Sequence, residues 1–204
     1  LEGAKHMCSP PPRDKENQEV VWKALEDGLF EVFSSDHAPY RFDDPEGKFK
    51  AGKNAHFKQI ANGVPGLEVR LPLLFSEGVA KGRITHQQFV ALTATNAARL
   101  YGLYPRKGTI AVGSDADLTI WDTDKKVTIT QSILHDAMDY TPYDGHVVTG
   151  WPITTISRGH VVWDDNTFLG EAGKGNFLPC DTPPALSAER RPVTKFDPVT
   201  GELR

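Results

Sequence analysis

The chain has 204 residues, of which 39% are hydrophobic and 25% are charged, and its formal net charge is −4. This composition is typical of a globular protein large enough for one sizeable core, and the acidic balance gives no reason to expect a nucleic-acid partner. No apolar run approaches the ~20 residues that a membrane span needs, so we expect a cytoplasmic protein that does not bind membranes.

The N-terminal part of the chain has the strand–helix–strand order of a βαβ unit. Residues 4–8 predict a short strand, and the three prolines that follow exclude a helix directly after it. Apolar i,i+4 pairs predict a helix over residues 15–27, and the apolar run at 29–33 predicts a second strand that leads to Asp36. In α/β proteins a carboxylate at this end of a strand lies where ligands bind, although on local grounds alone it is more often a turn residue.

The central part of the chain combines a long loop with short helices. Residues 40–62 are rich in Asp, Glu, Lys and Gly and predict a loop, and such long loops are often functional. Pro72 suits the first turn of a helix over residues 73–78. Thr85 and Gln88 form a capping-box pattern that opens a helix to residue 92, and a further helix is expected at 95–101.

From residue 107 the pattern changes to short β runs separated by Gly, Ser and Asp. Arg158-Gly159 predicts a tight hairpin turn between the last two runs. The expected strands are residues 109–112, 117–121, 126–129, 147–149, 153–157 and 160–163. They predict a small all-β unit, and the Pro-, Gly- and Arg-rich residues from 173 onward predict a tail without regular structure.

Four blocks resemble the cyclic amidohydrolases, in their D-hydantoinase/dihydropyrimidinase branch. They are Met-Cys-Ser-Pro-Pro-Pro-Arg at 7–13, Ser-Ser-Asp-His-Ala-Pro at 34–39, Ala-Asn-Gly-Val-Pro-Gly-Leu-Glu at 61–68, and the run at 95–118. Together they cover most of residues 3–175. The resemblance implies an α/β fold made of the C-terminal portion of a metal-dependent (β/α)8 TIM barrel and part of a small β-sandwich domain.

The same resemblance implies the domain organisation. Residues 1–104 would be the last βα units of the barrel, with an active-site loop at 37–66. Residues 105–172 would be β-sandwich strands, and residues 173–204 an extended C-terminal tail.

The resemblance also implies the roles of three residues. Asp36 would be a metal ligand and the general acid/base, which takes a proton from water and hands it to the leaving nitrogen. The backbones at Ser9 and Asn62 would bind the polar edge of a cyclic ureide or imide, although both residues also suit ordinary turns. His37 is not expected to be a ligand, because the metal histidines of this family come from other strands.

The cofactor implied is a divalent metal, a binuclear zinc centre. Its His-x-His pair, its bridging carboxylated lysine and two further histidines would lie upstream of Leu1. With only Asp36 of that ligand set, the 204-residue chain alone is expected to be inactive. The intact enzyme is expected to be a homo-oligomer, a dimer or a tetramer.

The activity implied is hydrolysis of carbon–nitrogen bonds in cyclic amides, which opens hydantoins or dihydropyrimidines to N-carbamoyl amino acids. Two alternatives stay open: a non-enzymatic dihydropyrimidinase-like scaffold protein, and an allantoinase-type enzyme. His37-Ala38-Pro39 favours an enzyme over the scaffold proteins, and Asn62-Gly63 favours a hydantoinase over an allantoinase.

Overall fold

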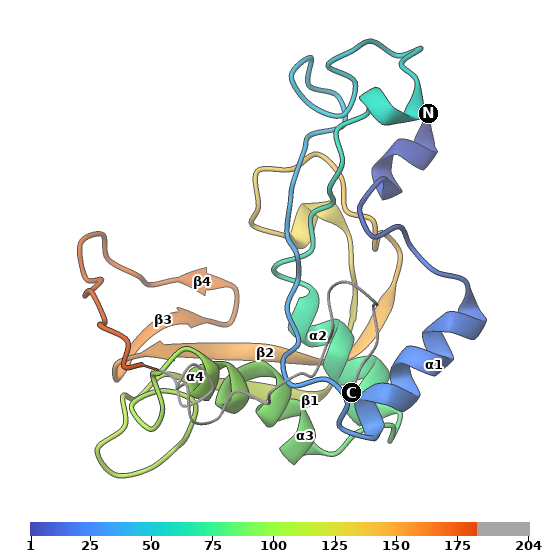
Figure 1. Ribbon diagram of the computed structural model, residues 1–204. Coiled ribbons are helices and arrows are strands. Elements are labelled where there is room, and N and C mark those ends of the chain that lie inside the picture. The colour runs from blue at the N-terminus through green and yellow to red at the C-terminus, as the bar shows by residue number, and fades with distance from the viewer. Residues whose placement is uncertain (183–204) are drawn as a thin grey trace, which may run out of the picture.

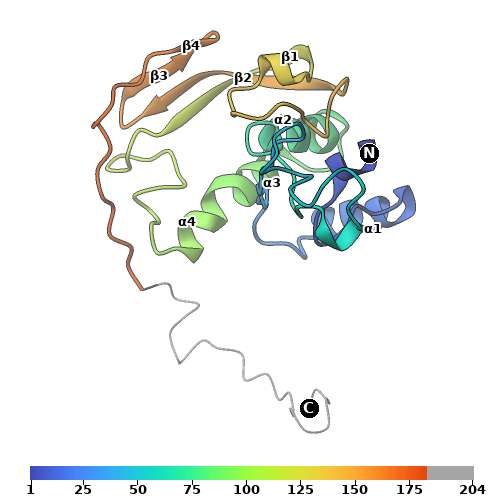
Figure 2. The same cartoon turned by 90° about the horizontal axis from the view of Figure 1, so that it is seen from above.

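A four-stranded antiparallel sheet and a layer of helices on one of its faces build the structure, a computed structural model that describes residues 1–182 (Figure 1). The strands lie in the order β1-β2-β3-β4. Their bounds are Leu118–Thr128 for β1, Val147–Ser157 for β2, His160–Asp164 for β3 and Thr167–Phe168 for β4. Viewed from above, the helices α2 to α4 lie together on one side of this sheet (Figure 2).

The helices fall into one separate helix and two continuous runs. The separate helix is α1, Lys15–Glu26, and the first run joins α2, Arg70–Leu74, to the π-helical η3, Phe75–Ala80. The second run joins α3, His86–Val90, through the π-helical η4, Ala91–Thr95, to α4, Asn96–Leu100. Short 3-10 turns complete the set: η1 at Glu2–His6, η2 at Phe57–Gln59 and η5 at Gln131–Ile133.

The predicted starts of two helices are confirmed. The Asp14 carboxylate accepts a hydrogen bond from the backbone N–H of Asn17 at 2.8 Å, which satisfies one of the free donors of the first turn of α1. The Thr85 hydroxyl and the Gln88 amide form a reciprocal capping box at the start of α3. Both helices therefore begin where the sequence predicts.

The main core joins the helices to the sheet. Phe75 stacks on Trp121 of β1 with ring centroids 5.0 Å apart, and Phe89 meets the same indole edge-on at 5.6 Å. The buried members of this cluster are Leu25, Leu74, Phe75, Ile84, Phe89 and Leu92. Burial of each such large side chain stabilises the fold by about 1.5–3 kcal/mol. A second cluster of Val69, Ile129 and Val148 packs the start of α2 against the ends of β1 and β2.

The predicted β runs between 117 and 157 merge into two long strands. β1 continues through a bulge at 123–125, where the Asp122 carboxylate accepts the backbone N–H groups of Asp124 and Lys125 at 3.0 Å. β2 continues through Pro152, which lacks an N–H and lies opposite Trp121 at a register shift, as prolines in sheets do. The two expected breaks are therefore irregularities within strands.

The predicted hairpin between β2 and β3 is confirmed. Arg158 and Gly159 both have positive φ, 49° and 82°, as a type I′ turn requires. A positive φ at both central positions matches the right-handed twist of the strands, which explains the tight connection.

Three strand predictions are wrong. Residues 4–8 lie largely within the 3-10 turn η1, and residues 29–33 and 109–112 have no strand structure. The backbone of 29–33 is bonded to helices, since Phe33 N–H donates to the Leu92 carbonyl and the Asn96 amide donates to the Glu31 carbonyl. Within the described residues the first βα segment therefore has one helix and no parallel strand pair.

The long loop prediction is confirmed, because residues 40–62 are irregular apart from η2. The loop projects from the end of the molecule opposite the sheet, beside the N-terminus (Figure 1). The expected tail lies outside the described residues from position 183 onward. Among residues 1–182 no helix has the length and apolar character needed to cross a bilayer.

Candidate functional site

Ser9 and Asn62, 53 residues apart in the chain, are in direct contact. The Asn62 side-chain amide donates a hydrogen bond to the Ser9 hydroxyl at 2.8 Å. The neighbouring backbones are also paired, because Gly63 N–H donates to the Met7 carbonyl at 2.9 Å. The two positions expected to hold a substrate therefore lie side by side.

The backbone groups of Ser9 and Asn62 are available to a ligand. Both residues are exposed, and within residues 1–182 their own N–H and C=O groups make no hydrogen bond. The residues on either side of Asn62 are, in contrast, hydrogen-bonded through N–H and C=O alike. The local geometry thus leaves unpaired, within residues 1–182, the backbone groups that the resemblance implies for substrate binding.

Asp36 lies on the third segment of the same assembly. Two residues later, Ala38 N–H donates to the Val64 carbonyl at 3.2 Å, which ties the Asp36 segment to the segment that carries Asn62. Asp36 itself has a φ of 47°, in the left-handed region that non-glycine residues rarely adopt. Its side chain is exposed and, among the described residues, forms neither a hydrogen bond nor an ion pair. Such a carboxylate is free to bind a metal ion or to exchange protons.

Gly63 is required where these segments meet. Its φ is 154°, and a Cβ built there would lie 2.4 Å from the Ala38 carbonyl oxygen and 2.6 Å from the Ala38 side chain. The glycine therefore allows the backbone next to Asn62 to approach the backbone next to Asp36.

His37 connects the Asp36 segment to the start of α2. Its Nδ1 accepts hydrogen bonds from the backbone N–H groups of Gly66 and Leu67, at 3.1 and 3.2 Å. An accepting Nδ1 is engaged in structure and is not a free ligand atom. Arg70 of α2 adds a second tie, because its guanidinium donates to the Phe33 carbonyl at 2.9 Å.

Lys48 is the residue at this site that the sequence did not single out. Its side chain is fully buried, and its ammonium group lies among three backbone carbonyls of the segments that carry Ser9 and Asn62. In the sequence it is one of several lysines in a polar loop, and nothing in the local pattern distinguishes it from the exposed Lys50 and Lys53.

Hydrogen bonds to Asp139 hold the first residues of the polar loop that carries Lys48. The Asp139 carboxylate accepts the backbone N–H groups of Phe42 and Asp43, both at 2.8 Å. Burial raises the pKa of Asp139, but backbone hydrogen bonds, including these two, and the nearby Arg41 charge together hold its pKa below the usual value. Tyr140 beside it packs edge-on against Phe42, and burial raises the pKa of its hydroxyl to about 12.

The described residues supply only part of a metal centre. Within residues 1–182 no three His, Cys, Asp or Glu side chains are grouped so that they could hold an ion. A catalytic zinc ion takes three protein ligands. Asp36, with its free carboxylate, fits the role of one such ligand.

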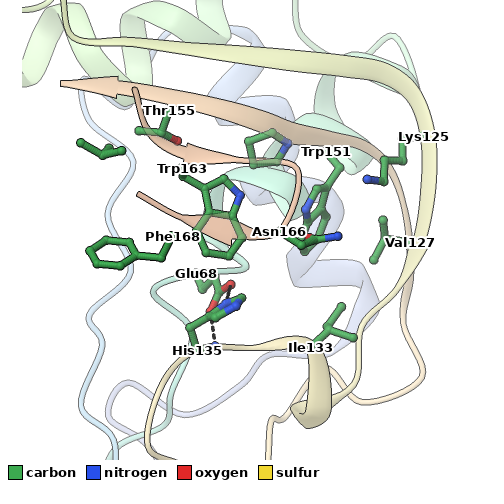
Figure 3. Close-up of a pocket in the computed structure, with 12 residues that line it drawn as sticks. Glu68, Lys125, Val127, Ile133, His135, Trp151, Thr155, Trp163, Asn166 and Phe168 are labelled. Atoms are coloured by element: carbon green, nitrogen blue, oxygen red, sulfur yellow. Dashed lines mark hydrogen bonds and ion pairs between the residues drawn. The ribbon is translucent and has the colours of Figure 1, made fainter. Parts of the chain in front are cut away.

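A separate cavity of about 610 Å³ lies between the sheet and the segment that precedes α2 (Figure 3). Trp151, Trp163 and Phe168 contribute its aromatic wall, and Asp36, Ser9 and Asn62 are not among its lining residues. At its edge the Glu68 carboxylate accepts the backbone N–H of His135 at 2.7 Å and pairs with its ring nitrogen at 2.8 Å. This pair joins the end of the 61–68 block to the loop that follows β1.

Comparison with known proteins shows extensive similarity to hydantoinases. The chain is 47% identical over 177 residues to the D-hydantoinase of Rhizobium radiobacter and 41% identical over 177 residues to a D-phenylhydantoinase of Escherichia coli. Each alignment covers 87% of this chain and 38% of the relative, so the chain spans well under half the length of these proteins.

Comparison of the structure with solved structures also shows similarity to hydantoinases. A solved D-hydantoinase structure superimposes with a TM-score of 0.81 at 46% identity, over 87% of this chain and 38% of that one. An L-hydantoinase (dihydropyrimidinase) from Arthrobacter aurescens superimposes with a TM-score of 0.75 at 37% identity, over 83% of this chain and 36% of that one. The model of the amidohydrolase family matches residues 5–162, and the chain therefore belongs to the amidohydrolase family.

Proposed function

We propose that this protein is a metal-dependent cyclic amidohydrolase that opens hydantoins or dihydropyrimidines to N-carbamoyl amino acids. The observation that carries the proposal is the meeting of Ser9, Asn62 and the Asp36 segment through hydrogen bonds between parts of the chain distant in sequence. The hydantoinase names of the relatives favour this reaction over an allantoinase or a non-enzymatic scaffold.

Substrate binding is assigned to backbone groups. The unpaired N–H and C=O groups at Ser9 and Asn62 suit the alternating donors and acceptors of a cyclic ureide, because backbone amides are rigid and their positions are set by the fold. The contact between the Ser9 and Asn62 side chains sets the spacing between these two binding elements.

Asp36 is assigned the proton transfers. Its carboxylate accepts a proton from the attacking water as the water oxygen forms a bond to the ring carbonyl carbon. The same proton then passes to the ring nitrogen as the carbon–nitrogen bond breaks, which produces a carboxylic acid and a free ureido group, and the acid then loses its proton to solvent. Asp36 has a left-handed backbone conformation. The segment that carries it is held by hydrogen bonds at Phe33 and at Ala38, on either side of Asp36.

A divalent metal, proposed as a binuclear zinc centre, supplies water of lowered pKa and polarises the carbonyl group when bound. Asp36 would be the ligand that the described residues contribute to it. The family's general dependence on metal supports this cofactor.

The proposed architecture follows the hydantoinase similarity. Residues 1–104 would belong to a TIM barrel with its active-site loop at 37–66, residues 105–172 to a β-sandwich, and residues 173–204 to an extended tail. The intact protein would be a cytoplasmic homo-oligomer, a dimer or a tetramer.

The test uses the protein with the upstream residues that the hydantoinase similarity implies, called the full-length protein. It is purified, loaded with zinc or manganese, and assayed on hydantoin, dihydrouracil and allantoin. We expect metal-dependent formation of the N-carbamoyl product from hydantoin, dihydrouracil or both. Turnover of allantoin alone, or of none of the three by a metal-loaded protein, would contradict the proposal.

A further inference from the structure

The Lys48 ammonium group lies at the junction of the two substrate-binding segments. It donates hydrogen bonds to the carbonyl oxygens of Met7 at 3.1 Å, Ala61 at 2.9 Å and Gly63 at 2.5 Å. An ammonium group has three donors, and all three are used here. Lys48 forms no ion pair among the described residues, so three backbone dipoles stabilise its charge.

The backbone of Lys48 is held as well. Its N–H donates to the Arg41 carbonyl at 2.8 Å, and its carbonyl accepts the Ala61 N–H at 3.3 Å. The side chain is 0% exposed, and this burial lowers the pKa of Lys48. Burial of a lysine costs free energy unless the ammonium group is well hydrogen-bonded. An apolar side chain of similar size would fill the same space without this cost in free energy. The hydrogen bonds of Lys48 therefore indicate a role beyond filling space.

The hydrogen-bond pattern around Lys48 separates fixed residues from free ones. Lys48 binds the residues immediately before and after Asn62, and it binds Met7, two residues before Ser9. The backbone groups of Ser9 and Asn62 remain unpaired within residues 1–182. Lys48 thus fixes both segments at their flanks and leaves the groups between them open.

We infer that Lys48 is a positioning residue that sets the spacing of the Ser9 and Asn62 backbones for binding of a cyclic ureide. The inference rests on the proposed function, and it adds a residue outside the motif blocks to the binding of that substrate. Lys48 touches no substrate in this role and acts through the carbonyls that it orients.

The test compares Lys48→Met with Lys50→Met in the full-length, metal-loaded protein. Methionine keeps a long, unbranched side chain and removes the three donors. Lys50 is a matched control in the same loop, because it is exposed and pairs only with Glu46 among the described residues. We expect Lys48→Met to raise KM for hydantoin by about tenfold while kcat per metal-loaded site stays within about threefold, and Lys50→Met to change neither.

A purely structural role for Lys48 predicts a different result. Lys48→Met would then lower the melting temperature and the active fraction but leave KM unchanged, and this outcome would overturn the inference. If the unsubstituted protein has no activity on any cyclic ureide, the proposed function itself fails, so the two failures are distinguishable.

Should Lys48→Met not fold, hydrogen exchange on the unsubstituted protein keeps the inference testable. Saturating hydantoin should slow exchange in the segments 7–9 and 61–64 together, and the slowing should include the N–H groups of Ala61 and Gly63, which lie beside Lys48 and outside the proposed substrate contacts. Slowing in only one of these two segments would contradict the inference.

Discussion

At the scale of single residues, the proposed chemistry depends most on Asp36. Its carboxylate is exposed and free of partners within the described chain, so its replacement removes reactivity with little loss of packing. We expect Asp36→Asn in the full-length protein to lower kcat/KM by at least about 10³-fold and to reduce bound metal. Measurement of turnover and of metal content by mass spectrometry, with Asp43→Asn as the exposed control, checks this. Near-normal turnover by Asp36→Asn would remove Asp36 from the mechanism.

Gly63 gives a second prediction at this scale. Gly63→Ala places a methyl group 2.4 Å from the Ala38 carbonyl oxygen, so the Asn62 and Asp36 segments must move apart. We expect a loss of about 1–3 kcal/mol in the free energy of unfolding, together with reduced turnover. Gly82→Ala is the control. Gly82 also has a positive φ, 71°, but a Cβ there would have nothing within 4 Å, so this variant shows the effect of backbone strain without a steric clash. Equal effects of the two substitutions would argue against a specific close approach at Gly63.

At the scale of elements, the loop at 40–62 has no regular structure apart from η2. Hydrogen bonds to distant parts of the chain hold it in place. Asp139 holds it through two backbone N–H groups, and Lys48 bonds it to Met7 and to the residues on either side of Asn62. Because the pKa of Asp139 is lowered, its contribution to stability is present above its unfolded value of 3.8 and is lost as the pH falls through the folded pKa.

Asp139→Asn tests this fastening. We expect the variant to melt at a lower temperature than the unsubstituted protein at neutral pH, and the difference to shrink as the pH falls below about 4. Thermal denaturation from pH 3 to pH 7 measures it, with Asp164→Asn on β3 as a control outside the loop. A difference that stays constant over this pH range would show that the Asp139 charge does not hold the loop.

At the scale of the whole molecule, the described residues lack a complete metal site and leave large apolar side chains exposed. No group of three potential ligands occurs within residues 1–182, and Val20, Leu29 and Phe168 are each more than two-thirds exposed. We therefore expect residues 1–204, expressed alone with added zinc or manganese, to show no ring opening of hydantoin or dihydrouracil. The full-length protein is the positive control in the same assay. Metal-dependent turnover by the 204-residue chain would show that Asp36 needs no further ligands from outside it.

The sequence by itself determined the features that depend on neighbours a few residues away. The start of the helix at residue 15, the Thr85 cap, the Arg158-Gly159 turn and the irregular loop at 40–62 follow from local backbone chemistry, and each is where the sequence predicts it. The motif blocks also identified the family and named the three candidate site residues.

Only the tertiary structure decided which residues meet. The run at 29–33 is as apolar as a strand, but its backbone bonds to helices, because strand formation depends on a neighbouring strand rather than on the run itself. The two predicted strands on either side of the bulge after Asp122 form one strand, because both pair with β2 across the sheet. Lys48 carries no local signal, since its three carbonyl partners lie 13 to 41 residues away and its burial exists only once those segments have packed together.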